Sequence, residues 1–266
     1  MNSLLNDSID IRALTAHEQF ERCVALQIEV WGYNDGDVIP RRVFVVAQRI
    51  GGQVIGAFDG DTIVGFAMSL PGYRDGQSYL HSHMLAVLPQ YRNAGVGRRL
   101  KLAQRDDAIA RGFDLMEWTF DPLEIKNAHL NIARLGAIVR RYQPDFYGPS
   151  TSPLQGGLPT DRLYAEWWLR SSRVASMLRG EIQSTPIVER VTVPYSIYQW
   201  KQDIQQRSQA QMLQTSIREA LQSAFQRGLT VVGYERDVDG NGSYLLGHWK
   251  EDPSRVDDRK ESLKTE

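Results

Sequence analysis

Hydrophobic and polar positions recur along the chain with two periods, which together predict a fold of mixed strands and helices. Residues 9–14 alternate in the manner of an edge strand. Thr15, with Glu18 three residues later, predicts a capping box at the start of a helix that ends near Trp31. After a loop, residues 41–50 are expected to form a second, short helix. The chain therefore opens with a strand-helix unit.

Strands and helices alternate after this unit as far as residue 169. Asp59-Gly60-Asp61 separates two apolar runs and is typical of a β-hairpin turn. Residues 144–160 contain four prolines and three glycines, which favours a loop or a lid. The expected strands are 54–58, 62–70, 79–87, 114–120, 137–142 and 163–169, and the expected helices are 95–111 and 123–135.

The pattern restarts at residue 171 with a smaller set of elements. It predicts a short helix, a strand at 187–193, a long helix at 197–227, and a hairpin of 229–234 with 244–249. In the long helix one apolar face is formed by Leu213, Ile217, Leu221 and Phe225, which lie four residues apart. We therefore divide the chain into a first domain, an α+β extension and an end expected to be a disordered tail, at residues 1–170, 171–250 and 251–266.

Composition narrows the class of protein. With 266 residues, 42% of them hydrophobic and 24% charged, the chain is too apolar to be disordered and too charged for a membrane protein. A net charge of -1 provides no bulk basic field for nucleic acid or an anionic membrane. Cys23 is the one cysteine, so no intrachain disulfide can form. The start has no signal-peptide pattern. We expect a soluble, cytoplasmic protein with neither nucleic acid nor membrane as a partner.

The most informative run is VLPQYRNAGVGRRL, at residues 87–100. An apolar strand enters a glycine-containing loop and leaves as the first turn of a helix, whose unpaired N–H groups and positive dipole end favour an anion. Arg92, Arg98 and Arg99 add cationic donors. The alternative, that the two glycines only shape a tight turn, is disfavoured by these arginines and by the strand-helix context. The run predicts a phosphate site.

The spacing of this run also separates it from commoner phosphate loops. Leu100 stands where Gly-x-Gly-x-x-Gly needs its third glycine. Arg-x-x-Gly-x-Gly after a strand that ends Val-x-Pro instead resembles the acyl-CoA pyrophosphate loop of the GNAT acyltransferase superfamily. The resemblance extends over about residues 9–170, including the order of elements. It implies a GNAT acyl-CoA N-acyltransferase fold, of the α/β class with a mixed sheet splayed at the CoA site, and acetyl-CoA or another acyl-CoA as co-substrate.

The resemblance also implies which residues bind CoA. Backbone groups of the strand would hold the pantetheine arm, at Leu85, Ala86 and Val87. The loop would cradle the pyrophosphate, with Arg92, Asn93, Ala94, Gly95, Val96 and Gly97, and Arg98 and Arg99 lie close enough to assist. A second CoA-contacting segment of the family resembles Asn127, Ala128, Leu135 and Gly136.

This chain departs from the family in that second segment. The family's frequent tyrosine, often cast as the acid that protonates the thiolate, is replaced by Ile132, and the family's asparagine is displaced toward the glycine. Asn127 and Asn131 are four residues apart and are expected to share one helix face, so either is a candidate for binding CoA or substrate, or for a surface or capping role. The residue that acts as general acid is left open.

Acyl transfer to nitrogen needs a neutral amine, and a base near the working pH assists it. His81 lies fourteen residues before Gly95, where several members of the superfamily place a strand carboxylate as base. His83 shares its face of the strand, and Glu117 on the neighbouring strand is the third candidate. Each can also be a satisfied strand residue. His81 and His83 have no obvious third metal ligand, so no metal is expected.

A second signature narrows the family. It consists of the segments 118–123, 127–131, 135–137, 161–163 and 166–168. The combination resembles the GNAT subfamily sometimes encoded beside N-succinylamino acid racemases, in which succinyl-CoA-dependent N-acylation of hydrophobic D-amino acids has been assigned. An α-carboxylate needs an arginine, and the candidates are Arg140, Arg141 and Arg162. Trp167 and Trp168 are expected to point to opposite faces of their strand, so that one can be core while the other lines a pocket, with both as core residues being the default expectation.

The sequence thus predicts N-acyl transfer from acetyl-CoA, succinyl-CoA or a related thioester to a small amine, an amino acid being one candidate. The alternative is a catalytically inactive CoA-binding regulatory or structural protein of the same fold. The presence of Ile132 in place of the family's frequent tyrosine supports this alternative. Acylation of protein lysines or N-termini has no support in an acidic or basic patch. Whether the extension caps the acceptor pocket or builds a homodimer is left open.

Overall fold

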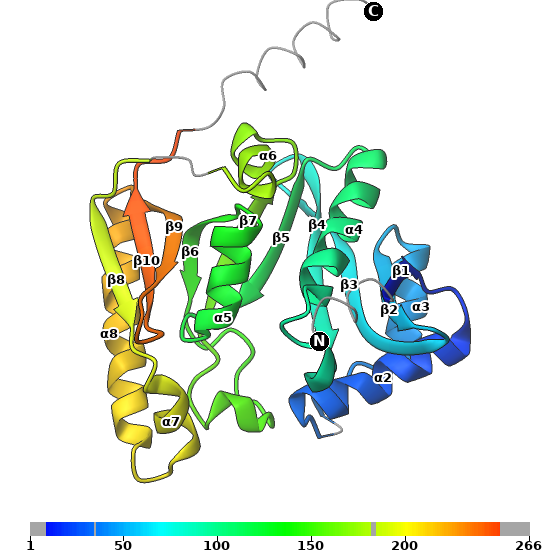
Figure 1. The fold of residues 1–266 in the computed structure, drawn as a ribbon, viewed down its shortest axis with the longest axis horizontal. Coiled ribbons are helices and arrows are strands. Elements are labelled where there is room, and N and C mark those ends of the chain that lie inside the picture. Colours follow the sequence, from blue (N-terminus) through cyan, green and yellow to red (C-terminus); the bar gives the residue numbers. More distant parts are fainter. Residues whose placement is uncertain (1–8, 35, 182–184, 251–266) are drawn as a thin grey trace, which may run out of the picture.

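The protein is built on one twisted sheet with helices on both of its faces (Figure 1). The computed structural model describes residues 9–34, 36–181 and 185–250, so the predicted tail at 251–266 lies outside the described residues. In these residues the sheet has ten strands in the order β1-β2-β3-β4-β5-β7-β6-β9-β10-β8. In the same part of the chain, no helix is long and apolar enough to cross a membrane.

Most expected elements are present, with bounds shifted by a few residues. The strands are β1 (Ile9–Ala13), β2 (Gln53–Asp59), β3 (Thr62–Arg74), β4 (Gln77–Val87), β5 (Leu115–Phe120), β6 (Ile138–Gln143), β7 (Arg162–Trp168), β8 (Glu189–Val193), β9 (Thr230–Arg236) and β10 (Gly242–Gly247). The helices are α2 (His17–Trp31), α3 (Arg41–Arg49), α4 (Val96–Ala110), α5 (Ile125–Ala128), α6 (Ser172–Leu178), α7 (Ile197–Gln202) and α8 (Arg207–Gln226). Short turns of other helix types are η1 (Pro89–Tyr91), η2 (His129–Arg134) and η3 (Pro153–Gln155).

The predicted cap of the first helix is wrong by one residue. Helix α2 begins at His17, and Ala16 occupies the capping position. The side chain of Gln19 accepts hydrogen bonds from the backbone N–H groups of Thr15 (2.8 Å) and Ala16 (3.1 Å). Because the helix starts one residue later than expected, Gln19 rather than Glu18 stands three residues after the cap and satisfies the free N–H groups.

The helix expected at 123–135 is a turn of α-helix, α5, followed by the π-helix η2. A π-helix has more residues per turn, so residues four apart no longer lie one above the other. Asn127 is exposed, whereas Asn131 is buried with 3% of its surface accessible. The expectation that these two side chains share one helix face is therefore wrong.

The long helix expected at 197–227 is two helices, α7 and α8. The backbone becomes extended at Asp203, whose carboxylate accepts a hydrogen bond from the Gln205 N–H (2.9 Å). The predicted apolar face of the second helix is confirmed, because Ile217 and Leu221 are buried and Leu213 and Phe225 pack against the same core.

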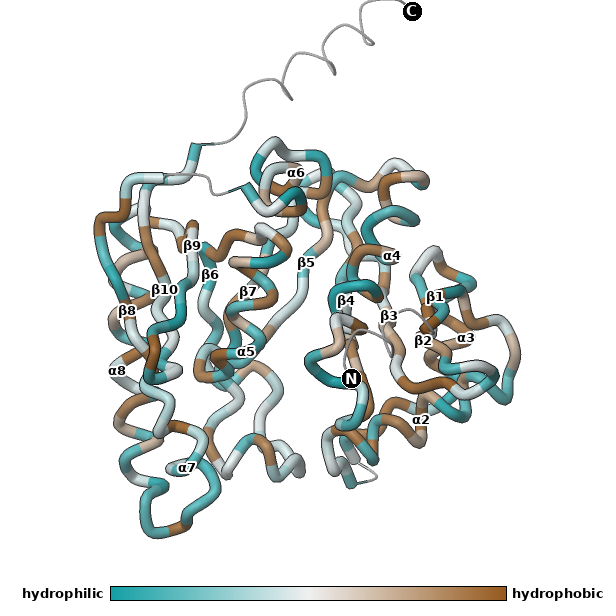
Figure 2. The backbone as a smooth tube through the Cα atoms, viewed as in Figure 1, coloured by the Kyte–Doolittle hydropathy of each residue, from teal (hydrophilic) through white to brown (hydrophobic). Residues whose placement is uncertain are grey.

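The C-terminal extension continues the sheet of the first domain. Strand β9 pairs with β6, and β10 lies between β9 and β8. One hydrophobic cluster fills the space around β1 to β4, and a second joins β5, β6 and β7 to the extension. In Figure 2 the hydrophobic positions follow strands such as β2, β3 and β10. The core thus crosses the boundary drawn at residue 170.

A buried cluster of charged side chains links the extension to the residues that follow β5. The ammonium of Lys201, on α7, lies 2.9 Å from a carboxylate oxygen of Asp121 and 3.1 Å from one of Glu124. Lys201 and Asp121 are both buried. Charges removed from water in this way are stable only while they stay paired.

We expect Lys201→Met to lower the free energy of unfolding by about 3 kcal/mol, because two carboxylates lose their cation. Urea unfolding at pH 7 measures this loss. Lys126→Met, at an exposed position of α5, is the control and should change the free energy by less than about 0.5 kcal/mol. Equal midpoints for the two variants would contradict a stabilising role for the cluster.

Candidate functional site

The site forms where two parallel strands separate. Strands β4 and β5 are paired in register only at Leu80 with Met116 and at His81 with Glu117. Beyond these pairs the strands continue, to Val87 and to Phe120, without pairing to each other. The edge of β4 that faces β5 therefore carries backbone groups with no partner strand from Ser82 onward, where an elongated ligand can bind.

A β-bulge lies in β4 beside the point of separation. Met68 of β3 stands opposite Met84, and the next residue, Ser69, stands opposite Ser82. His83 is therefore the extra residue of the bulge. A bulge re-aims the side chains around it, and here it lies between His81 and the unpaired edge.

The predicted phosphate loop connects the end of β4 to α4. Asn93 and Gly95 have φ angles of 63° and 80°, so both adopt the left-handed conformation that turns the chain sharply into the helix. The first N–H to bond within the helix is that of Arg99, which donates to the Gly95 carbonyl (3.0 Å). The amides of residues 96–98 precede this bond and point along the positive end of the helix dipole. The loop thus has the geometry of an anion site.

The three arginines of this loop have different neighbours. Arg92 folds back so that its Nε donates to the Val87 carbonyl (3.1 Å), which keeps it beside the loop. Arg98 donates to the Leu178 carbonyl of α6 (3.4 Å), and its Nε is buried without a hydrogen-bond partner. Arg99 donates to the Ile9 carbonyl of β1 (2.6 Å). Arg98 and Arg99 thus point toward neighbouring elements, and the three arginines do not all gather at the loop.

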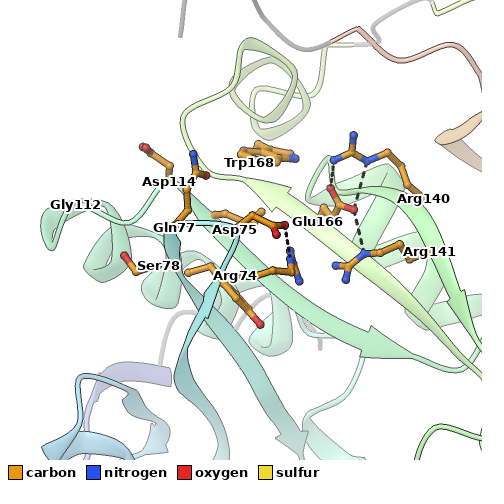
Figure 3. Close-up of a pocket in the computed structure, with 13 residues that line it drawn as sticks. Arg74, Asp75, Gln77, Ser78, Gly112, Asp114, Arg140, Arg141, Glu166 and Trp168 are labelled. Carbon is orange, nitrogen blue, oxygen red and sulfur yellow. Dashed lines mark hydrogen bonds and ion pairs between the residues drawn. The ribbon is translucent and has the colours of Figure 1, made fainter. Parts of the chain in front are cut away.

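On the sheet face that carries His81, buried carboxylates alternate with guanidinium groups. Glu117 and Glu166 stand directly opposite each other on β5 and β7, and both are buried. Arg74 donates two hydrogen bonds to Glu117 (2.5 and 2.9 Å), and Arg141 donates a third (2.5 Å). Arg140 holds Glu166 (2.5 Å), as Figure 3 shows. Two carboxylates in contact across a ladder repel each other, so this row of arginines stabilises the pair.

A bulge in β6 explains why consecutive arginines reach the same face. Val139 stands opposite Ala165 and Tyr142 opposite Leu163, which leaves Arg140 and Arg141 together opposite one residue of β7. Side chains of consecutive strand residues normally point to opposite faces. The bulge cancels this alternation and brings both guanidinium groups to Glu166.

A cavity of about 730 Å³ adjoins this charged row, toward the end of β4 and β5 that lies away from the phosphate loop (Figure 3). Its walls come from the β3–β4 turn, the start of β5, and β6 and β7. They include Arg74, Asp75, Tyr79, Asp114, Arg140, Arg141, Glu166 and Trp168. Trp168 lines this cavity, whereas the neighbouring Trp167 is fully buried and donates to the Leu135 carbonyl (2.7 Å). The two tryptophans therefore differ as their opposite faces allow, and the default expectation that both belong to the core is wrong for Trp168.

His81 lies between the phosphate loop and this cavity. Ser82 bonds to side chains of α4, so His81 points to the opposite face of β4, with its ring centre 5.9 Å from that of His83. Burial lowers the pKa of His81 to about 4, and His83 and Lys101 act in the same direction. At neutral pH the imidazole is therefore uncharged and has a free lone pair.

Lys101 approaches the point of separation from the α4 side. Its amine donates to the Ser82 hydroxyl (2.7 Å) and lies 3.6 Å from the ring centre of Trp118. These two residues immediately follow the last paired residues of β4 and β5. Burial lowers the pKa of Lys101 well below its usual range. The side chain thus contacts both strands at their divergence.

The remaining candidates occupy less central positions. Arg162 donates to the Asp161 carbonyl (2.8 Å) and lies over the ring of Tyr147, outside the row of arginines on Glu117 and Glu166. Ile132 is fully buried in the core. In the described residues, no group of three or more His, Cys, Asp and Glu side chains is placed to hold a metal.

Sequence reasoning missed Arg74, Tyr164, Glu166 and Lys101. A signal was available for Lys101. A lysine next to Leu100, on the face of a helix that is otherwise buried, indicates a buried amine.

An anion-binding loop thus follows a strand that diverges from its parallel neighbour, an arrangement that can hold an elongated ligand with a phosphate end. Residues 20–131 match the sequence model of the GNAT acetyltransferase family, a match that spans less than half of the chain. The predicted GNAT fold is confirmed. No curated protein matches the chain.

Solved structures of the same fold are distant in sequence. The ribosomal-protein-S18-alanine N-acetyltransferase of Escherichia coli is 16% identical, with a TM-score of 0.50 over 62% of this chain and 96% of that one. A protein from Acinetobacter baylyi described as an acetyltransferase is also 16% identical, with a TM-score of 0.50 over 62% and 93% of the two chains. At such identity the likeness establishes the fold.

The low pKa of His81 makes stability depend on pH. The unfolded imidazole binds a proton near pH 6.5, whereas the folded one resists protonation down to about pH 4. The free energy of unfolding should therefore fall, by up to about 3 kcal/mol, as the pH decreases from 6.5 to 4. We expect His81→Gln to flatten this part of the urea-unfolding profile. His17→Gln, at an exposed position of α2, is the control, and equal slopes for both variants would contradict burial of His81.

Proposed function

We propose that the protein transfers an acyl group directly from acyl-CoA to the nitrogen of a small amine. The observation that carries the proposal is the alignment of three features on one strand. The phosphate loop follows the end of β4, the unpaired edge runs along it, and His81 stands at its last pairing with β5. From Val87 to His81 the strand spans about 20 Å, a length suited to a pantetheine arm.

The donor would bind as an added strand along β4. Because β5 has diverged, backbone groups of Leu85, Ala86 and Val87 on that edge are available to the amides of the pantetheine arm. The loop from Arg92 to Gly97 offers its amides to the pyrophosphate. Asn127, exposed on α5, is a secondary contact in this proposal.

His81 is the base that the geometry favours. Its imidazole faces the side of β4 on which the cavity lies and is neutral at pH 7, although a pKa of about 4 makes it a weaker base than an ordinary histidine. Glu117 is less suited, because its oxygens already accept three hydrogen bonds from Arg74 and Arg141. His83 belongs to the bulge, and we assign it a secondary position beside His81.

The reaction needs no acid at the position of Ile132. In the proposed step the amine nitrogen attacks the thioester carbon, His81 accepts the proton released by the amine, and the C–S bond breaks. A thiol of ordinary acidity, with a pKa near 8.5, leaves as a thiolate without a dedicated proton donor near neutral pH. The oxygen that gains charge lies beside the bulge of β4, whose backbone N–H groups can stabilise it.

The cavity favours an acceptor that carries a carboxylate. Arg74, Arg140 and Arg141 line it together with the acids Asp75, Asp114 and Glu166, and Trp168 offers an apolar wall. We propose that Arg140 binds the carboxylate of a small amino acid. This agrees with the resemblance to the subfamily encoded beside N-succinylamino acid racemases, and succinyl-CoA is included among the proposed donors for that reason. Arg162 is a second candidate for this role.

We expect Arg92→Glu to raise the dissociation constant of CoA about tenfold or more, because it places a carboxylate against the pyrophosphate. Isothermal titration calorimetry measures this constant, with Gly95→Asp as a second variant. Arg42→Glu, at an exposed position of α3, makes the same charge change elsewhere. Unchanged affinity in folded Arg92→Glu and Gly95→Asp would refute the phosphate-loop assignment.

We expect His81→Ala to reduce turnover about a hundredfold while the affinity for CoA stays within twofold, because the base is lost and the donor site is kept. Thiol release from acetyl-CoA and succinyl-CoA with pooled amino acids is the assay. Equal turnover in wild type and variant would remove His81 as base. Binding of CoA by the wild-type protein without turnover on a broad amine panel would favour the inactive, regulatory alternative.

A further inference from the structure

We propose that the C-terminal extension is part of the acceptor site, and that Arg218 of α8 is a positioning residue for acceptor binding. Arg218 holds in place the loop at residues 144–161, named here the acceptor loop, which connects β6 to β7. The inference rests on the proposed function, since it assigns the extension to the same site. It does not depend on which amine is the acceptor.

The anchor of the acceptor loop is a buried carboxylate. Arg218 donates two hydrogen bonds to the two oxygens of Asp161 (2.8 and 2.9 Å). Asp161, at the end of the loop, is fully buried and also accepts hydrogen bonds from the Tyr142 hydroxyl and from the Asp145 N–H (3.0 Å). A bidentate guanidinium-carboxylate pair fixes orientation as well as distance. Both ends of the loop thus converge on one ion pair with α8.

Further contacts hold the middle of the acceptor loop against the extension. The amide of Gln214, on α8, donates to the Pro159 carbonyl (2.9 Å). Gly156 lies so close to α7 that a side-chain carbon there would be 2.6 Å from the Lys201 carbonyl oxygen. Only glycine permits such an approach. The extension therefore determines the path of the loop.

The opposite side of the loop is bonded to the N-terminal half. The hydroxyl and N–H of Thr151 both donate to the carboxylate of Asp37 (2.6 and 2.7 Å), and the hydroxyl of Ser152 donates to the Trp31 carbonyl (2.7 Å). The loop thus spans from α8 to the connection between α2 and α3. It contacts β5 at Thr119, two residues beyond the last pairing of β5 with β4.

Aromatic side chains of the loop lie against this face. Tyr147 shares a hydrogen bond with Thr119 of β5 (3.0 Å), and the ring centre of Phe146 lies 5.8 Å from that of Tyr164. Tyr164 in turn lies under the guanidinium of Arg141 (4.2 Å), which binds Glu117. Movement of the loop would therefore be transmitted to Arg141, which lines the proposed acceptor cavity beside Arg140.

Helix α8 also lines a hollow beside these arginines. This second hollow has a volume of about 370 Å³ and shares Arg140 and Arg141 with the larger cavity. The helix contributes Gln222, Phe225 and Gln226 to its wall. The extension thus reaches the proposed acceptor surface directly, as well as through the loop.

The test compares Arg218→Met with Arg227→Met. Arg227 is the C-terminal cap of the same helix and pairs with Glu189 at an exposed position, so its loss removes an ion pair without touching the loop. The first measurement is hydrogen exchange of residues 144–161, and the second is the affinity for CoA. The third is KM and kcat, measured with pooled α-amino acids and with the acyl donor that the wild-type protein uses. For Arg218→Met we expect at least tenfold faster exchange in the loop, a KM raised at least fivefold, and CoA affinity and kcat within twofold.

Equal exchange and equal KM in the two variants would overturn the proposal. If Arg218→Met does not fold, Tyr142→Phe weakens the same anchor by one hydrogen bond, and Arg218→Lys keeps the charge without the bidentate geometry; each should show a smaller change of the same kind. A uniform loss of CoA affinity and kcat would indicate a merely structural role and contradict positioning. If the wild-type protein binds no acyl-CoA, the proposed function fails, and hydrogen exchange still decides whether Arg218 holds the loop.

Discussion

The structure depends on how short the pairing between the parallel strands β4 and β5 is. Strands β4 and β5 pair at two successive positions and then diverge, which leaves a polar backbone edge inside an otherwise continuous sheet. Unpaired backbone groups in such a place are costly unless a ligand or water satisfies them. Lys101 approaches the divergence from one face and His81 stands on the other, between the predicted phosphate loop and the cavity.

Two β-bulges and several ion pairs allow the inner strands of the sheet to carry charged side chains. The bulge at His83 lies beside the divergence, and the bulge in β6 turns Arg140 and Arg141 to one face. Glu117 and Glu166 would repel each other across the β5–β7 ladder, and the arginines compensate this repulsion. The same guanidinium groups face the cavity. Stability and the proposed recognition of a carboxylate thus draw on one set of residues.

The extension is joined to the first domain both through the β-sheet and through the hydrophobic core. Its strands lengthen the sheet beyond β6, and its hydrophobic side chains enter the core around Trp167 and Tyr244. Two buried ion pairs, Lys201 with Asp121 and Arg218 with Asp161, connect it to the end of β5 and to the acceptor loop. Breaking either leaves a charge without a partner, which makes the connection specific as well as strong.

The sequence by itself determined the order of elements, the strand-loop-helix of the phosphate site, and the opposite faces of Trp167 and Trp168, because these depend on local periodicity and on glycine conformation. It did not show the π-helix that separates Asn127 from Asn131, the break at Asp203, or the row of Arg74, Glu117, Arg141, Glu166 and Arg140. These features arise from register shifts and from pairing between distant strands and helices. Only the tertiary structure decided them, since the partner that a buried charge finds is not encoded in its own neighbourhood along the chain.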